Sequence, residues 1–212
     1  MAPTASRRAP VRMVVLGDSI AYGTGAARTE DTIGRRLAAE LTADGFDVDL
    51  HALAVPGAVS ADLAAQVRRA VALGPDLALV VIGANDLARF VPAAQATAAL
   101  GAAVAALRAA GSAVVVVPAP DMSMVPFVPP ALRPLVRGAC AVLQEGQTRV
   151  AEAGGATVAS VVADLATAFV ADPGLFSADR FHPSSAGYAR IARALTPHVL
   201  AAARARRDEA AA

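Results

Sequence analysis

The sequence predicts an α/β fold, a three-layer α/β/α sandwich of the flavodoxin-like type with a parallel sheet of about five strands. Three observations predict it. Short apolar runs alternate with longer helical patterns from residue 11 to residue 203. Four of the five apolar runs are nearly continuous, as expected for strands that are buried on both faces. The strict rotation of strand and helix requires crossover connections, which produce a parallel sheet covered by helices on both sides.

The expected strands follow one another at intervals that leave room for a helix between them. They span residues 12–16, 46–54, 77–82, 113–117 and 157–161. The second run, FDVDLHALA, alternates apolar and polar residues and is therefore predicted to be an edge strand with one solvated face.

The expected helices fill the gaps between these strands. Their ranges are 32–42, 60–73 with Ser60 as the N-cap, 92–110, 131–153 and 185–203. No repeat or linker divides the chain, so residues 11–203 are expected to form a single domain. Residues 1–10 are predicted to be a disordered tail, and residues 204–212 a frayed helix end.

Composition limits the possible functions. The 212 residues carry a formal net charge of +1, which provides no electrostatic footprint for nucleic acid. They are 56% hydrophobic but only 4% aromatic, so Ala, Val and Leu must fill the core. Cys140 is the single cysteine and is interpreted as a small buried hydrophobe, and no intrachain disulfide can form.

The amino-terminal region contains Arg7 and Arg8, as some secretion signals do. The apolar run that follows, residues 11–16, is too short for a signal peptide and is interrupted by Arg12. Proline, glycine and charged residues interrupt every run that could span a bilayer. We therefore expect a soluble cytoplasmic protein with no stable membrane anchor.

Polar residues gather where the expected strands end. The strand ends are followed by Gly17-Asp18-Ser19, by Val55-Pro56-Gly57, by Gly83-Ala84-Asn85-Asp86, by Pro118-Ala119-Pro120-Asp121, and by a later loop with Asp179 and His182. In an open parallel sheet, ligands bind outside the carboxyl ends of the strands. The sequence thus predicts a site at this edge.

The residue types at this edge match nucleophilic catalysis. A serine hydroxyl needs a general base, usually a histidine that a carboxylate orients. Of the three histidines, His51 lies in an expected strand and His198 in the last helix, and both are interpreted as structural. His182 has Asp179 three residues before it, so Ser19, His182 and Asp179 are the predicted nucleophile, base and orienting acid.

The same reaction needs donors for an oxyanion. The backbone N–H of Ser19 is one candidate. Gly57 is a second, because a residue without a Cβ lets its N–H approach a substrate closely. The side-chain amide of Asn85 is the third candidate.

Four blocks together resemble a known family. GDSIAYG, the lone glycine in AVPGAVSADL, GANDL and DRFHP occur in the order found in GDSL-type, or SGNH, serine hydrolases, from residue 17 to residue 183. Each block alone is weak, but four in order are specific. The resemblance implies an esterase or lipase-like acyl hydrolase with catalytic Ser19, Asp179 and His182 and an oxyanion hole of Ser19, Gly57 and Asn85. Ala21 and Ile20 depart from the commoner residues of the first block and bear only on pocket shape.

Each of these residues also has a structural interpretation. Ser19 could cap a helix, Gly57 could simply form a turn, and Asn85 could belong to an Asx-turn with Asp86 capping the next segment. Asp18 is predicted to be structural, accepting hydrogen bonds from loop N–H groups. A metal site is not expected, since no cysteine or second well-placed histidine completes a ligand shell.

The stretch DMSMVPFVPPALRPLV, residues 121–136, is apolar and rich in proline. It either packs as a loop on the core or binds the hydrophobic part of a substrate. In the second case Met122, Met124 and Phe127 would line an acyl pocket.

The leading hypothesis is a serine ester hydrolase that needs no cofactor and acts on a small ester, such as an acylated lipid or sugar, through an acyl-enzyme. An acyltransferase that uses the same site is the first alternative. A non-catalytic flavodoxin-like binding domain is the second, although the chain lacks a glycine-rich phosphate loop. The G-x-S-x-G elbow of ordinary α/β-hydrolases is absent as well. Neither acyl-chain length nor oligomeric state follows from the sequence.

Overall fold

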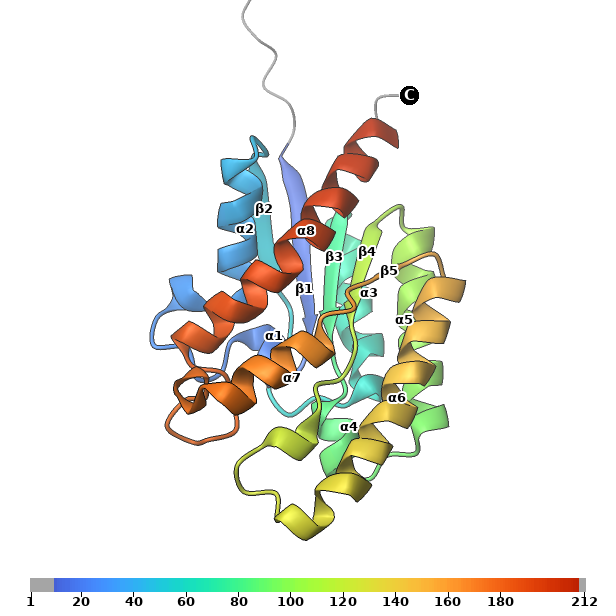
Figure 1. The fold of residues 1–212 in the computed structure, drawn as a ribbon. Coiled ribbons are helices and arrows are strands. Elements are labelled where there is room, and N and C mark those ends of the chain that lie inside the picture. The colour runs from blue at the N-terminus through green and yellow to red at the C-terminus, as the bar shows by residue number, and fades with distance from the viewer. Residues whose placement is uncertain (1–9, 210–212) are drawn as a thin grey trace, which may run out of the picture.

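A five-stranded parallel sheet with the strand order β2-β1-β3-β4-β5 forms the centre of the computed structural model (Figure 1). The structure describes residues 10–209, so nearly all of the tail expected at residues 1–10 lies outside the described residues, as do residues 210–212. The strands are β1 (Val11–Gly17), β2 (Val48–Ala52), β3 (Leu77–Val81), β4 (Ala113–Val117) and β5 (Thr157–Val158). The predicted fold class is confirmed, and β2 is an edge strand as expected.

The last strand is shorter than expected. After Val158, the Ala159 N–H still donates to the Val116 carbonyl at 2.9 Å, but the Val161 N–H turns back to the Ala159 carbonyl at 2.8 Å. This local turn ends the pairing with β4 at Ala159, so β5 ends three residues before the predicted end, and the next helix begins at Val162.

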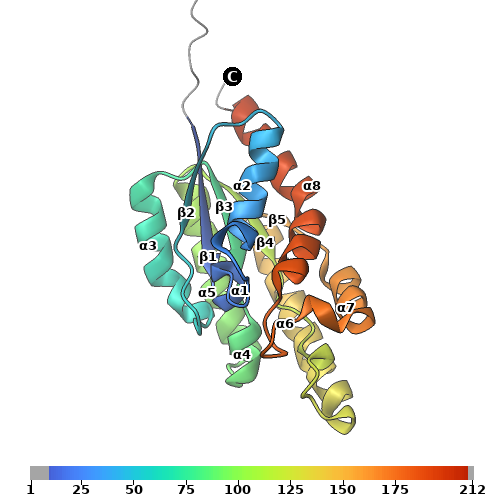
Figure 2. The same cartoon turned by 90° about the vertical axis from the view of Figure 1, so that its left-hand side faces the viewer.

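Helices cover both faces of the sheet. They are α1 (Ser19–Tyr22), α2 (Ile33–Ala43), α3 (Leu63–Leu73), α4 (Ala84–Ala88), α5 (Ala93–Ala109), α6 (Arg133–Ala153), α7 (Val162–Ala171) and α8 (Ser185–Glu209). Figure 2 shows α2 and α8 on one side of the strands and α3 and α5 on the other. The chain thereby forms the three layers that the alternating pattern predicts.

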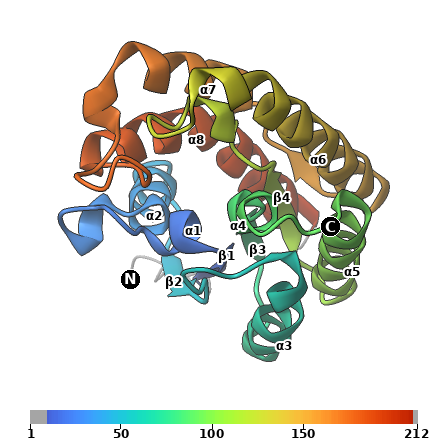
Figure 3. The ribbon, with the colours of Figure 1, turned by 90° about the horizontal axis from the view of Figure 1, so that it is seen from below.

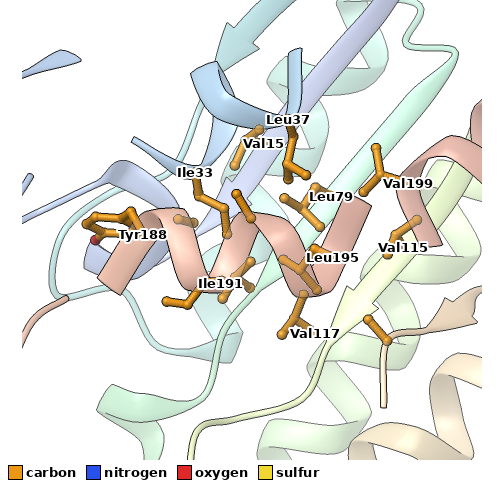
Figure 4. Packing of buried hydrophobic residues seen from close by; sticks show 14 of the residues in the cluster. Val15, Ile33, Leu37, Leu79, Val115, Val117, Tyr188, Ile191, Leu195 and Val199 are labelled. Carbon is orange, nitrogen blue, oxygen red and sulfur yellow. The ribbon is translucent and has the colours of Figure 1, made fainter. Parts of the chain in front are cut away.

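Alternate residues of each strand enter two separate cores. Val15 and Leu79 pack under α2 and α8, beside Leu37 and Leu195 (Figure 4). Val14, Leu16 and Val80 instead face α3 and α5, where Leu63 and Leu100 are fully buried. Because side chains alternate along a strand, a continuous apolar run serves both cores, which is why the predicted central strands show no alternation.

The last helix continues beyond its predicted end at residue 203. Arg204 donates to Asp44 at 3.1 Å, and the Arg207 guanidinium lies 4.9 Å from the centre of the Phe46 ring. These contacts attach the last two turns of α8 to the loop after α2. The segment from residue 204 to Glu209 is therefore helical and attached to the domain, which differs from the expected frayed end.

All five strands run in the same direction, so their carboxyl ends meet at one edge of the sheet. Figure 3 views the molecule from that end, where the short helices α1 and α4 directly follow β1 and β3. The helix-like segment expected after Ser19 is thus α1, whereas α4 was not predicted. Each of them begins at a strand end where polar residues were expected to gather.

Candidate active site

Ser19 follows a tight turn at the end of β1. Gly17 has a φ of +136°, and a Cβ at this position would collide with the Val81 carbonyl oxygen, so only glycine fits between β1 and β3 here. The Asp18 carboxylate then caps α1 by accepting the Ile20 N–H at 2.9 Å. Ser19 is thus the first residue of α1 and not its cap, and its side chain is held at the sheet edge.

A hydrogen-bonded chain joins Ser19 to two residues that lie far away in the sequence. The Ser19 Oγ is 2.9 Å from His182 Nε2, across a separation of 163 residues. The other ring nitrogen, Nδ1, is 2.6 Å from Asp179 Oδ2. This is the arrangement in which a histidine takes a serine proton while a carboxylate fixes its tautomer.

The loop around Asp179 is organised by that carboxylate. Its Oδ1 accepts the Ser177 hydroxyl at 2.7 Å and the backbone N–H groups of Phe181 and His182, both at 2.9 Å. Partial burial by itself would raise the pKa of Asp179, but the hydrogen bonds from His182, Phe181 and Ser177 lower it well below its usual value. Asp179 is therefore ionised at neutral pH and accepts from His182.

Gly57 and Asn85 lie on two loops that are fastened together. Gly57 occupies a turn closed by the Ala58 N–H and the Val55 carbonyl at 3.1 Å, and its φ of +83° favours glycine. The Asn85 Nδ2 donates to the Ala58 carbonyl at 3.0 Å, 27 residues away. Asn85 is thus not engaged in a local Asx-turn.

Asp86 makes a second connection between the same two loops. Its carboxylate is 1% exposed and accepts the Ser60 N–H and the Ser60 hydroxyl, all at 3.0 Å. The expectation that Ser60 is the N-cap of the helix at 60–73, which is α3, is therefore wrong. The helix starts instead with a 3-10 turn, Ser60–Asp62, in which Asp62 accepts the Val59 N–H at 2.9 Å.

Asp18 has the structural surroundings that the sequence predicts. It is 1% exposed, and burial raises its pKa to about 6, with the nearby Asp86 adding to the effect. The hydrogen bond from Ile20 and the proximity of His182 oppose this rise. The carboxyl therefore titrates below neutral pH, and it has no hydrogen bond to the Ser19 hydroxyl among the contacts of the described residues.

A cavity of about 70 Å³, here called the apolar pocket, lies beside the segments that carry Ser19, Asn85 and His182. It is lined by Ile20, which follows Ser19, by Ala84, which precedes Asn85, and by Phe181 and Pro183 on both sides of His182. Two of the predicted pocket residues, Met122 and Met124, contribute to the wall.

Phe127, the third predicted pocket residue, is not part of that wall. It is 62% exposed and stacks on Phe181 with 5.7 Å between ring centres. Phe181 in turn packs edge-on against the His182 ring at 4.8 Å. Phe127 therefore borders the site from outside.

The residues interpreted as structural lie elsewhere. His51 is on β2 and pairs with Asp49 at 3.0 Å, and His198 is on α8. Cys140 is 1% exposed on α6, where its sulfur accepts the Met122 N–H at 3.3 Å, and burial raises the pKa of its thiol. Among residues 10–209, no group of three His, Cys, Asp or Glu side chains is placed to hold a metal ion.

Two buried glutamines near the site were not anticipated. Gln66 of α3 accepts the Gly17 N–H at 2.8 Å and donates to the Gly17 carbonyl at 2.9 Å. Gln147 of α6 accepts from the Ala119 N–H and donates to the Ile82 carbonyl. They satisfy backbone groups where the strands separate. The sequence signal that could have identified them is a glutamine among the apolar residues on the buried face of each helix.

Tyr188 of α8 was also not anticipated. Its ring is fully buried, and its hydroxyl donates to the Thr24 carbonyl at 2.8 Å. Burial raises the pKa of this hydroxyl, and the carboxylates of Asp18 and Asp179 raise it further. Tyr188 thereby fixes the segment after α1 against the helix that follows His182.

The geometry agrees with a family comparison. Residues 15–190 match the model of the GDSL-like Lipase/Acylhydrolase family. The chain belongs to this family. The match begins inside β1 and includes Ser19, the loops of Gly57 and Asn85, and His182, so it includes every block on which the resemblance depends.

A GDSL-like esterase of Mycobacterium tuberculosis, Rv1075c, is 35% identical to this chain over 186 residues. The alignment covers 86% of this chain, which spans 59% of the length of that relative. Among solved structures, TesA superposes with a TM-score of 0.74 at 22% identity, covering 88% of this chain and 96% of TesA.

Axe2, an acetylxylan esterase of Geobacillus stearothermophilus, superposes with a TM-score of 0.71 at 20% identity over 89% of this chain and 93% of its own. At these identities the two structural neighbours establish the shared fold. The described helices of the present protein include none that is both long enough and apolar enough to cross a bilayer.

Proposed function

We propose that this GDSL family member is a serine ester hydrolase that cleaves carboxylic esters through an acyl-enzyme on Ser19. The observation that supports this most directly is the chain Ser19 Oγ, His182 and Asp179, with contacts of 2.9 and 2.6 Å. Catalytic mutants of Axe2 carry alanine in place of a serine, a histidine and an aspartate, which are the same residue types.

In the first half of the reaction, the Ser19 Oγ attacks the ester carbonyl and its proton passes to His182 Nε2. The Oγ–C bond forms as the carbonyl oxygen becomes an oxyanion. Asp179 keeps the Nδ1–H directed at its Oδ2 and stabilises the imidazolium that results. Nε2–H then protonates the leaving alcohol as the ester C–O bond breaks.

The oxyanion would be held by three donors: the Ser19 N–H, the Gly57 N–H and the Asn85 amide. An amide nitrogen has two hydrogens, and Asn85 uses one for the Ala58 carbonyl, which leaves the second for the substrate. The hydrogen bond that Asn85 donates to the Ala58 carbonyl and the one that Asp86 accepts from the Ser60 N–H fix this loop in advance. Preorganised donors stabilise a transition state because they need no rearrangement when charge develops.

In the second half, water attacks the acyl-enzyme with His182 as base, and the free acid leaves. The acyl group would occupy the apolar pocket, since its wall is made of Ile20, Met122, Met124 and Phe181. The proposed substrates are therefore esters with an apolar acyl group.

The proposal is tested by rapidly mixing the enzyme with an excess of p-nitrophenyl acetate and following the pre-steady-state release of nitrophenolate. A burst of nitrophenolate equal to the enzyme concentration, with acetyl on Ser19 by peptide mass spectrometry, is expected. Hydrolysis without a burst and without modified Ser19 would contradict the acyl-enzyme. Absence of any reaction with a fluorophosphonate would favour the binding-domain alternative, and labelling of a residue other than Ser19 would contradict the proposed nucleophile. Ester products formed in the presence of added alcohols would favour acyl transfer.

A further inference from the structure

Two more cavities lie behind the apolar pocket. The first, here called the inner chamber, measures about 60 Å³ and lies between α7 and the ends of β3 and β4, with Val81, Val117 and Ala166 in its wall. The second, here called the helix cleft, measures about 350 Å³ and lies between α6 and α7, with Ala141, Thr148 and Ala163 in its wall. In Figure 1, α6 lies beside β5 and α7 lies below it.

The three cavities form a series because neighbours share walls. The apolar pocket and the inner chamber have in common Ile20, Pro120, Asp121, Met124, Leu165 and Ile191. The inner chamber and the helix cleft have in common Pro118, Asp121, Val162 and Ala166. An acyl chain that occupied all three cavities would start next to Ser19, pass along the inner side of α7 and reach the surface between α6 and α7.

The lining of the inner chamber is suited to an alkyl chain, whereas the wall of the helix cleft also contains the polar side chains Arg137, Gln144, Thr148 and Ser160. Apart from Asp121, every residue of the inner chamber is apolar. The charge of Asp121 is already engaged, because its Oδ1 accepts the Ser123 N–H at 2.9 Å and its Oδ2 lies 3.6 Å from Arg137 Nε. The chamber thus offers a bound chain contacts with carbon and no free donor for a polar head.

The partitions between the cavities are side chains that are small or flexible. Met124 and Leu165, both half-buried, separate the apolar pocket from the inner chamber. Methionine has an unbranched side chain that changes rotamer easily and fits varied apolar shapes. Between the inner chamber and the helix cleft, Ala166 contributes only a methyl group.

We propose that the inner chamber and the helix cleft receive the distal part of a medium or long acyl chain. The substrates are then esters of fatty acids longer than the apolar pocket alone accommodates. This inference rests on the proposed function, since the chain enters from an acyl group on Ser19. In contrast with a chain lying on the surface, the distal methylenes would be enclosed beneath α7.

The test is a chain-length series of p-nitrophenyl esters from acetate to dodecanoate, each below its micellar concentration. The wild type is compared with Ala166→Phe, which fills the junction of the inner chamber and the helix cleft. Thr167→Phe is the matched control, because the adjacent Thr167 is exposed and lines none of the three cavities. Ala166→Leu is a milder variant in case the phenylalanine unfolds α7.

Each methylene removed from water contributes roughly fourfold in affinity. Exclusion of two or more of them by Ala166→Phe should therefore lower kcat/KM for decanoate by about tenfold or more. The value for acetate should stay within about twofold of wild type, because acetate does not reach the junction. Thr167→Phe should leave the decanoate to acetate ratio unchanged, and Ala166→Leu should lower it by a smaller factor.

Several outcomes would overturn the inference while leaving the proposed function intact. One is an unchanged decanoate to acetate ratio in the folded Ala166→Phe and Ala166→Leu variants, with folding checked by circular dichroism. Another is a wild type that hydrolyses acetate but shows no gain in kcat/KM beyond butyrate. A wild type that forms no acetyl-enzyme and hydrolyses none of the esters would instead contradict the proposed function itself.

Discussion

Replacement of Asp179 by asparagine isolates one contact of the proposed catalytic chain. Asp179 Oδ1 accepts three hydrogen bonds, from the Ser177 hydroxyl and from the N–H groups of Phe181 and His182. Asparagine keeps an oxygen at that position, so the loop conformation should survive. Only the oxygen that faces His182 Nδ1 at 2.6 Å is exchanged for an NH₂ group.

The expected loss in kcat follows from this exchange. An amide NH₂ donates to Nδ1, so Nε2 would carry the hydrogen and could no longer accept the Ser19 proton. The wrong tautomer lowers turnover by about 10⁴-fold in serine triads, which corresponds to about 5 kcal/mol of transition-state stabilisation. Ser177→Ala is the matched control. This substitution removes one hydrogen-bond donor to Oδ1 and leaves the contact of Oδ2 with His182, so it should lower kcat by about tenfold or less.

The assay is single-turnover release of nitrophenolate from p-nitrophenyl acetate, with circular dichroism to confirm that both variants fold. An Asp179→Asn variant that retains a tenth or more of the wild-type rate would refute the orienting role of Asp179. Equal losses for Asp179→Asn and Ser177→Ala would also refute it, because the effect would then arise from the loop and not from the tautomer.

Three further predictions concern neighbouring groups. Ser19→Ala and His182→Ala should each lower kcat on the order of a million-fold. The double variant should lower kcat by little more than either single variant, because both residues act in one proton transfer. Strictly additive losses would contradict this reasoning. Asn85→Ala should lower kcat about a hundred- to a thousand-fold with the fold intact by circular dichroism, and a loss below tenfold would remove Asn85 from the oxyanion hole. Burial raises the pKa of Asp18 from 3.8 to about 6, so the folded state binds a proton more tightly than the unfolded state. As pH rises from about 4 to above 6, this group should therefore lower the free energy of unfolding by about 3 kcal/mol. Asp18→Asn should remove that dependence in urea unfolding at pH 4 and pH 7, and the same pH dependence in both proteins would disprove it.

Strand order explains how two of the reactive residues come together, and helix packing explains the position of the other two. Ser19 and Asn85 follow β1 and β3, which are hydrogen-bonded neighbours, so parallel pairing alone brings these two strand ends to one edge. The loop of Asp179 and His182 follows α7 and not a strand directly, and pairing does not place it. Its position depends on Tyr188 and on α8, whose packing against β1 and α2 is a tertiary contact.

Other details depended on contacts between residues distant in sequence. Ser60 has the side chain of a helix cap, yet its hydroxyl donates to Asp86, because a buried carboxylate needs donors more than an exposed helix end does. Phe127 is an aromatic residue of the kind that lines acyl pockets, but it lies outside the apolar pocket, where it stacks on Phe181. In both cases the contact that the side chain makes is with a residue distant in the sequence, so the sequence near it does not predict the contact.

The sequence by itself determined the layers, the parallel sheet and the edge at which polar residues gather, because hydrophobic periodicity and strand ends are local properties of the chain. Only the tertiary structure decided that the Ser19 hydroxyl meets His182 across 163 residues, and that two apolar cavities lie beside α7. The physical reason is that distances of 3 Å between side chains result from the packing of whole helices on the sheet, which no short stretch of sequence encodes.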